Sequence, residues 1–197
     1  MSRSLSQDDL ARFKAQLCDV AEGLFAEHGA DNVSMRQIAG AMGISPMTPY
    51  RYFPSRDAIL AAVRIRGFER FAAALEAAYR DTPGDAAAKA MAAGAAYIDF
   101  AFAHANTYRL MFGTKQHEDS GEGPLGAAVA RARATLSVYG ADLIARGLSA
   151  KSALAMETLV WSALHGAVTL ELAGTVPAGS AREVLALFGQ MRPPAQG

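Results

Sequence analysis

The sequence predicts an all-α protein, and three observations lead to this prediction. Apolar residues recur at intervals of three and four over most of the 197 residues, which is the spacing of one helix face. Serine, aspartate and proline stand where helices are expected to begin, and glycine stands where they are expected to end. No segment alternates apolar and polar residues as a half-buried strand does, and no repeat of fixed period is present.

The composition argues against several classes of protein. No stretch of about 18 apolar residues lacks a charge, so we expect no transmembrane helix. The N-terminal segment MSRSLSQDDLARFK lacks the apolar run of a secretory signal. Cys18 is the single cysteine, which excludes an internal disulfide and suits a reducing cytoplasm. We expect Cys18 to be a small core residue, and the alternative is that its thiol is a reactive sensor.

The first expected helix covers residues 7–28. Ser6 precedes it as a cap, with Asp9 three residues later, and Gly29 follows it as a stop signal. The apolar face of this helix consists of Leu10, Phe13, Leu17, Ala21, Leu24 and Phe25. This spacing predicts an amphipathic helix that covers a core.

Two short helices are expected on either side of Gly43. The segment SMRQ, which begins at Ser34, is a capping box for the first of them. Ser45 and Pro46 supply the cap and the first-turn proline of the second. Pro49 stands inside this second helix, where a proline removes a backbone hydrogen bond, so we expect a distorted first turn.

This arrangement predicts a helix-turn-helix. Ala39 is small where the two helices must cross, and Gly43 can take the positive φ that a sharp turn needs. Ile38, Met42 and Ile44 are expected to point into the small core. A motif of this kind presents the N-terminal residues of its second helix to the major groove of DNA.

Charge is segregated along the chain, although the formal net charge is zero. Residues 32–66 contain five arginines and one aspartate, a local charge of +4. The arginines are Arg36, Arg51, Arg56, Arg64 and Arg66. This segregation predicts a basic face on a neutral protein, as DNA binding requires.

A long helix is expected from Ser55, which caps it, to the break at Thr82–Asp85. We place a helix-turn-helix DNA-binding domain at residues 1–66 and a helical ligand-binding and dimerisation domain at residues 67–197, with the long helix crossing between them as a lever. The second domain is expected to contain helices over Ala86–His104, Tyr108–Phe112, Leu125–Arg146, Ala150–Ala173 and Ser180–Met191. Residues 113–124 form a polar loop, which we expect to be mobile.

Residues Val33–Leu60, VSMRQIAGAMGISPMTPYRYFPSRDAIL, resemble the helix-turn-helix of TetR-family transcriptional regulators. The shared motif is IAxxxGIS, then YxYF and a capped basic–acidic pair, and the likeness covers residues 7–66. Further on, YRLMFG (Tyr108–Gly113) and WSALHGAVTLELAG (Trp161–Gly174) resemble a subgroup with a Trp–His–Gly signature. The resemblance implies a homodimeric repressor that binds a near-palindromic operator and is released when a small molecule binds its C-terminal domain.

The residue chemistry and the resemblance together suggest DNA contacts. Arg36 is expected to read guanine through bidentate hydrogen bonds. The resemblance implies that Tyr50 contacts a base or its methyl group and that Tyr52 contacts a phosphate. Arg56 stands where the family commonly has lysine, at a helix start where phosphate can bind. The candidate DNA-contacting set is Ser34, Arg36, Ser45, Met47, Thr48, Tyr50, Arg51, Tyr52 and Arg56.

Plainer alternatives remain for several of these side chains. Either tyrosine of the motif can instead cover the core, and Arg36 and Arg51 can be surface charges. Arg64 and Arg66 are expected to be solvated or salt-bridged rather than bound to DNA. Phe53 is expected to anchor the second short helix to the first.

Aromatic residues, a methionine and one histidine mark a candidate small-molecule site. They are Tyr97, Phe100, Tyr108, Met111, Phe112, Trp161 and His165. An apolar lining with a few polar tips suits a hydrophobic or aromatic inducer, and the alternative for each residue is an ordinary core position. For His165 the alternatives are a buried, hydrogen-bonded histidine and a metal ligand. No Glu-x-x-His pair or histidine cluster supports a metal, so we expect neither metal nor cofactor.

The last two helices, Ala150–Ala173 and Ser180–Met191, are rich in alanine, leucine, valine and methionine. Exposed in a monomer they would form a large apolar patch, so we expect a two-fold four-helix interface. The alternative is that they cover the monomer's own core.

No Ser-His-Asp order or phosphate-binding loop indicates an enzyme. The predicted function is a cytoplasmic, ligand-responsive DNA-binding repressor, and the alternative is a ligand-independent or activating DNA-binding regulator.

Overall fold

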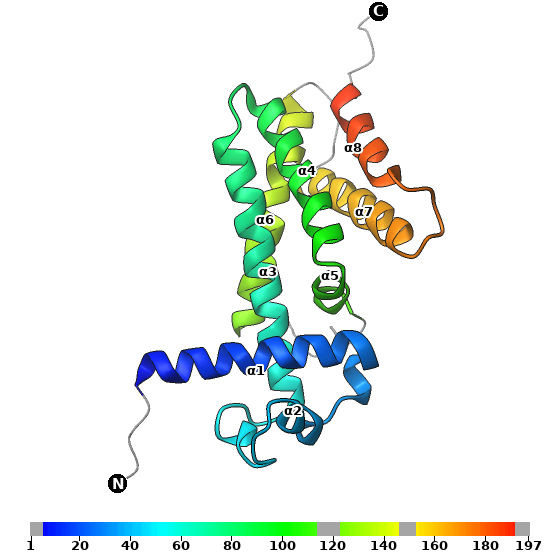
Figure 1. Ribbon diagram of the computed structural model, residues 1–197. Coiled ribbons are helices and arrows are strands. Elements are labelled where there is room, and N and C mark those ends of the chain that lie inside the picture. The colour runs from blue at the N-terminus through cyan, green and yellow to red at the C-terminus, as the bar shows by residue number, and fades with distance from the viewer. Residues whose placement is uncertain (1–5, 114–122, 146–152, 192–197) are drawn as a thin grey trace, which may run out of the picture. The chain divides into compact units, whose positions relative to one another are not determined.

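The regular structure of the chain is helical. The computed structural model describes residues 6–113, 123–145 and 153–191, and every regular element in these ranges is a helix (Figure 1). The α-helices are α1 (Gln7–His28), α2 (Met35–Ala41), α3 (Arg56–Asp81), α4 (Ala86–Ala103), α5 (Ala105–Met111), α6 (Gly123–Ala145), α7 (Ala153–Leu172) and α8 (Ser180–Gln190). Two short 3-10 helices are η1 (Ala30–Asn32) and η2 (Pro49–Arg51). The all-α prediction is confirmed, and no helix in these ranges is long and apolar enough to cross a membrane.

The chain forms two compact units. The first unit contains Met1–Gly67 and Asn106–Gly126, and the second contains Phe68–Ala105 and Ala127–Gly197. The first unit therefore takes α5 from the middle of the chain, in addition to the N-terminal segment. The boundary between the units falls inside α3, one residue beyond the predicted domain boundary at 66.

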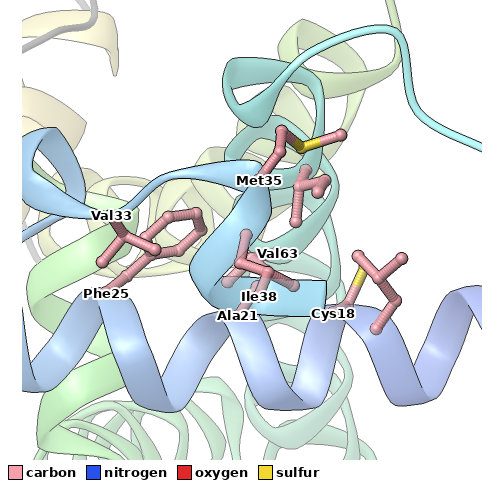
Figure 2. Close-up of a cluster of buried hydrophobic side chains, with 9 residues drawn as sticks. Cys18, Ala21, Phe25, Val33, Met35, Ile38 and Val63 are labelled. Carbon is pink, nitrogen blue, oxygen red and sulfur yellow. The ribbon is translucent and has the colours of Figure 1, made fainter. Parts of the chain in front are cut away.

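The core of the first unit joins α1, α2 and the N-terminal part of α3. Its buried side chains are Leu17, Cys18, Ala21, Phe25, Val33, Met35, Ile38, Ile59 and Val63. Figure 2 shows this cluster in close-up. The prediction that Cys18 is a core residue is confirmed, since this side chain is only 2% exposed. Burial also raises the pKa of its thiol, which disfavours the reactive thiolate.

Local capping signals set the ends of the first helices as predicted. The Ser6 hydroxyl accepts the Asp9 N–H at 3.1 Å and begins α1. Gly29 ends α1 with a φ of 81°. Ser34 begins α2 with a complete capping box, and the Ser55 hydroxyl accepts the Ala58 N–H at 3.1 Å at the start of α3.

The turn after α2 has the geometry predicted for Gly43. Its φ is 66°, in the left-handed region where only glycine avoids steric strain. The Ile44 N–H donates to the Ala39 carbonyl and the Gly43 N–H to the Gly40 carbonyl, both at 3.0 Å. These bonds satisfy the last carbonyls of α2 and reverse the chain sharply.

The second short helix is not an α-helix, and in this respect the prediction was wrong. The segment from Ser45 is a succession of tight turns that ends in η2. The Thr48 N–H donates to the Ser45 carbonyl at 2.9 Å, and the Arg51 N–H donates to the Thr48 carbonyl at 3.1 Å. Pro49 has no N–H to continue an α-helical ladder, so the expected distortion of the first turn is confirmed.

The second unit packs α4, α7 and α8 together. Helix α8 contacts both α7 and α4, and α4 contacts α7, as Figure 1 shows for α7 and α8. The predicted helices are confirmed with small changes at their ends. Arg146 and residues 150–152, which the prediction included in helices, lie outside the described residues, as does most of the predicted polar loop.

Helix α8 begins differently from the prediction. Ser180 and Glu183 do not form a capping box, because the Ser180 hydroxyl donates to the Pro177 carbonyl at 2.8 Å. The Glu171 carboxylate on α7 instead accepts the N–H groups of Gly179 at 2.7 Å and Ala181 at 2.8 Å. These two hydrogen bonds lower the pKa of the Glu171 carboxyl. Glu171 of the preceding helix therefore caps the N-terminus of α8.

Replacing Glu171 with glutamine is expected to destabilise the protein by about 1 kcal/mol at neutral pH, since the N-terminus of α8 loses a charged acceptor. The lowered pKa means that the contribution is complete at neutral pH and is lost as pH falls through the folded-state pKa. Urea unfolding at neutral and acidic pH measures this difference. The matched control is Glu183→Gln, in the first turn of α8, which should cost less. A Glu171→Gln penalty that persists at acidic pH would contradict this account.

Candidate nucleic-acid interface

The turns from Ser45 to Arg51 carry the most exposed part of the predicted interface. The side chains of Met47 and Tyr50 are 68% and 49% exposed, among the largest values for hydrophobic residues in the described chain. Ser45 and Arg51 are also exposed, and Thr48 is half-buried. An apolar side chain, an aromatic ring and a guanidinium thus project from one short, hydrogen-bonded segment. Such a surface can contact thymine methyl groups, sugars and phosphates.

At the start of α2, Arg36 is more available for DNA contact than Ser34 is. Arg36 is exposed in the first turn of the helix. The Ser34 hydroxyl donates to Oε1 of Gln37 at 2.7 Å and accepts the Gln37 N–H at 3.3 Å. The Ser34 N–H also donates to Oε1 of Gln37, at 2.8 Å. Both donors of Ser34 are therefore used in the cap, and a phosphate would have to compete with Gln37 for them.

Tyr52 and Phe53 attach residues 45–51 to the rest of the first unit. The Tyr52 ring lies 4.5 Å from the Phe13 ring, centroid to centroid, at an interplanar angle of 37°. Phe53 packs against the core, which confirms its predicted anchoring role, and Nζ of Lys14 lies 5.8 Å from its ring centroid. The Tyr52 ring therefore covers α1, as the plainer alternative for the tyrosines stated. A phosphate contact would involve only its hydroxyl.

Arg56 has several partners within the first unit. Its Nη1 donates to the Ala30 carbonyl at 2.8 Å, and its Nε donates to Oδ1 of Asp57 at 2.9 Å. Its Nη2 contacts the same Asp57 oxygen and lies 3.8 Å from Oδ1 of Asp31. A phosphate would have to compete with these carboxylates for the guanidinium.

The predicted basic face is smaller than the count of arginines indicates. Arg64 is buried rather than solvated, with 6% of its surface exposed, and its Nη2 donates to the Met111 carbonyl at 3.4 Å. Arg66 forms the expected salt bridge, with Nη2 at 2.6 Å from Oδ1 of Asp19. With Arg56 also paired, the exposed positive charge of this segment comes mainly from Arg36 and Arg51.

The candidate ligand residues divide between the two units. Tyr108, Met111 and Phe112 belong to the first unit. Tyr108 and Met111 are buried, and the rings of Tyr108 and Phe112 lie 4.8 Å apart. These three residues pack within the DNA-binding half of the fold, whereas the prediction placed them in the second domain.

The remaining candidates lie in the second unit. Tyr97 and Phe100 of α4 meet the Phe71 ring of α3 edge-on, at centroid distances of 5.0 and 5.4 Å. Trp161 and His165 share one side of α7 and are half-buried. Burial lowers the pKa of His165, so its imidazole is neutral near pH 7. A neutral imidazole both donates and accepts hydrogen bonds, which suits a ligand with a single polar group.

Sequence reasoning missed two side chains of these clusters. Phe71 of α3 was not among the candidate ligand residues, and its ring contacts those of both Tyr97 and Phe100. The Arg133 guanidinium lies 5.5 Å from the Trp161 ring centroid and pairs with Glu157 at 3.1 Å. Nothing local in the sequence indicates the Arg133 contacts, since they join helices α6 and α7.

Two family models match the chain. Residues 17–63 match the model of bacterial regulatory proteins of the tetR family. Residues 90–191 match the tetracyclin repressor-like C-terminal domain, which covers half of the chain. The chain belongs to the TetR family. Members of the TetR family are DNA-binding transcriptional regulators, so the expectation that the protein is not an enzyme is confirmed.

The chain is also similar to individual proteins. A protein of unknown function from Rhodococcus sp. RHA1 is 28% identical, with a TM-score of 0.75 over 90% of this chain and 91% of that chain. The TetR-family regulator PfmR from Thermus thermophilus shares the fold, with 17% identity and a TM-score of 0.65 over 88% of this chain and 94% of that chain. An HTH-type transcriptional repressor of Mycobacterium tuberculosis is 35% identical over 69 residues, which are 35% of this chain and 37% of that protein.

Proposed function

We propose that this TetR-family regulator is a repressor that a small hydrophobic or aromatic inducer releases from a palindromic operator. The observation that carries the proposal is the exposure of Met47, Tyr50 and Arg51 on the turns after α2. Met47 and Tyr50 both expose apolar surface to water on this short segment. Such side chains are suited to contact base edges and thymine methyl groups in a DNA groove. The Mycobacterium tuberculosis relative is named a repressor, which favours repression over activation.

The proposed division of labour follows the exposure of each side chain. Arg36 and Tyr50 read bases, and Arg51 binds phosphate. Around them, Ser45, Met47 and Thr48 complete the contact surface, while Ser34, Tyr52 and Arg56 touch the DNA backbone at its edges. We assign this role to a DNA-binding domain of residues 1–66 and the sensing and dimerising roles to residues 67–197, in a protein that works in the cytoplasm.

The proposed inducer site is the aromatic cluster of the second unit. We assign its apolar walls to Tyr97 and Phe100 of α4, whose rings contact Phe71. Its polar groups would come from Trp161 and His165 of α7, a helix that contacts α4. The likeness of residues 161–174 to the Trp–His–Gly subgroup supports the same location. Induction is a population shift, because an inducer that prefers the DNA-incompetent conformation lowers operator affinity.

The proposed dimer interface is the outer surface of α7 and α8. This surface exposes Leu154, Leu159, Leu170, Leu187 and Met191. Leu159 and Leu170 are eleven residues apart and so lie on one side of α7, and Leu187 and Met191 are four residues apart near the end of α8. A two-fold contact would bury all of these leucines against a second copy.

Replacing Leu187 with glutamate is expected to weaken dimerisation by at least about tenfold, because a buried charge without a partner is costly. Light scattering coupled to gel filtration across a dilution series measures this change. The matched control is Phe102→Glu, which places the same charge at an exposed apolar residue of α4, outside this surface. A Leu187→Glu protein that remains dimeric would place the interface elsewhere.

The experiment that tests the function is binding of the purified protein to DNA fragments from upstream of its own coding sequence, near physiological salt. Tight binding to one short palindromic fragment, followed by release on addition of apolar compounds, supports a ligand-responsive repressor. Operator binding that no compound alters supports the alternative of a ligand-independent or activating regulator. Preference for no fragment over bulk DNA, in protein shown by mass spectrometry to carry no small molecule, contradicts the proposal.

A further inference from the structure

A cavity of about 360 Å³ lies within the first unit, at the C-terminal end of α1. Residues of α1, η1, α3 and α5 line it. Its volume is within the range of about 300 to 1,000 Å³ that is typical of small-molecule sites. None of the residues in the aromatic cluster proposed for the inducer lines this cavity, so the cavity is distinct from the proposed inducer site.

One wall of the cavity is apolar. It includes Phe25 of α1, Leu60 of α3 and Leu110 of α5. Phe25 is fully buried in the core of the first unit, and Leu60 and Leu110 pack against that core. This wall is therefore part of the core of the first unit and offers a preformed apolar surface.

The other wall is mainly cationic. Arg64 is a buried guanidinium whose Nη2 donates to the Met111 carbonyl at 3.4 Å. Arg109 is exposed, and its Nη1 donates to Oδ1 of Asn106 at 3.5 Å, at the limit of a hydrogen bond. The single acidic residue of the lining is Asp31, which lies 3.8 Å from the Arg56 guanidinium. The lining therefore contains two guanidinium groups and one carboxylate.

We propose that this cavity binds a small organic anion with an apolar body, namely a carboxylate on a hydrocarbon chain. The apolar wall of Phe25, Leu60 and Leu110 takes the chain. The carboxylate pairs with Arg109 at the edge and with Arg64 inside, in charge-assisted hydrogen bonds that a planar guanidinium is well shaped to make. Because the bound anion contacts α1, α3 and α5 together, it stabilises the unit that also contains residues 45–51, the turns proposed to contact DNA.

Calorimetric titration of the full chain with three probes tests this proposal. Octanoate has both the charge and the chain, 1-octanol has the chain alone, and acetate has the charge alone. Octanoate is expected to bind at least about tenfold more tightly than either of the others. Equal affinity for octanoate and 1-octanol would overturn the proposal, as would equal affinity for octanoate and acetate or no octanoate binding at all.

A matched pair of variants locates the site. Arg109→Gln removes an exposed cavity charge without disturbing the core and is expected to weaken octanoate binding at least about tenfold. Arg12→Gln removes an exposed charge of the same unit outside the cavity lining and should leave the affinity within about twofold. Wild-type affinity in Arg109→Gln, or an equal loss in both variants, would overturn the proposal. The titration involves no DNA, so its failure would leave the proposed repressor function untouched.

Discussion

Substituting Arg36 with alanine is expected to weaken binding of the palindromic operator by at least about 30-fold. Loss of a bidentate guanine contact typically costs about 1–3 kcal/mol. A homodimer carries the change in both reading heads, so the cost on a complete operator is about 2–6 kcal/mol, and the smaller value corresponds to about 30-fold. Fluorescence anisotropy with operators altered at single base pairs measures both affinity and specificity. The variant should no longer prefer guanine at the contacted position.

Two further variants separate base reading from simple charge. Arg51→Ala should weaken all DNA sequences alike and lower the salt dependence of binding, since Arg51 is assigned to phosphate. Arg80→Ala removes an exposed charge at the end of α3 and should change neither property. If Arg36→Ala keeps the wild-type affinity and specificity, Arg36 is only a surface charge. If it lowers affinity for every sequence equally, it contacts phosphate.

Replacing Gly67 with valine is expected to destabilise the first unit by about 3 kcal/mol. A Cβ atom at this position would lie 2.8 Å from Cγ of Met111 and 3.0 Å from Cγ2 of Thr107. Both neighbours are buried, and the Thr107 hydroxyl donates to the Glu22 carboxylate. Neither side chain can move without disturbing the packing of α5, so the added methyl groups force an overpacked core. Denaturant unfolding followed by far-UV circular dichroism measures the loss.

The control for Gly67→Val is the same substitution at Gly23, in the middle of α1. No atom lies within 4 Å of a Cβ built at Gly23. Valine is a slightly better helix former than glycine, so Gly23→Val should stabilise the protein by a few tenths of a kcal/mol. Similar stability changes for the two variants would show that the close packing of α5 on α3 contributes little.

Local signals explain why the sequence predicted most helices correctly. Ser6, Ser34 and Ser55 cap helices through residues three positions away, and Gly43 takes a positive φ within its own turn. Such features depend on neighbours in the chain and are visible in the sequence. The segment after Gly43 resisted prediction because one proline changed an otherwise helical pattern into a series of turns.

The candidate site was harder to predict because its charges are balanced by distant residues. Arg66 pairs with Asp19, which is 47 positions away, and Arg64 bonds to Met111 across the same separation. Thr107 bonds to Glu22 over 85 positions. These contacts remove Arg64 and Arg66 from the predicted basic face, and three of the seven predicted ligand residues lie in the first unit. No spacing rule along the sequence reports on such tertiary partners.

The position of α5 has a consequence for protein engineering. This helix falls within the residues that match the C-terminal family domain, yet it packs in the same compact unit as the DNA-reading turns. A chimera that joined residues 1–67 to the sensor of another regulator would set a foreign side chain against Gly67 and a foreign partner beside Glu22. The DNA-binding unit of this protein can therefore be exchanged intact only if α5 is transferred together with residues 1–67. The segment to be transferred is discontinuous in the gene.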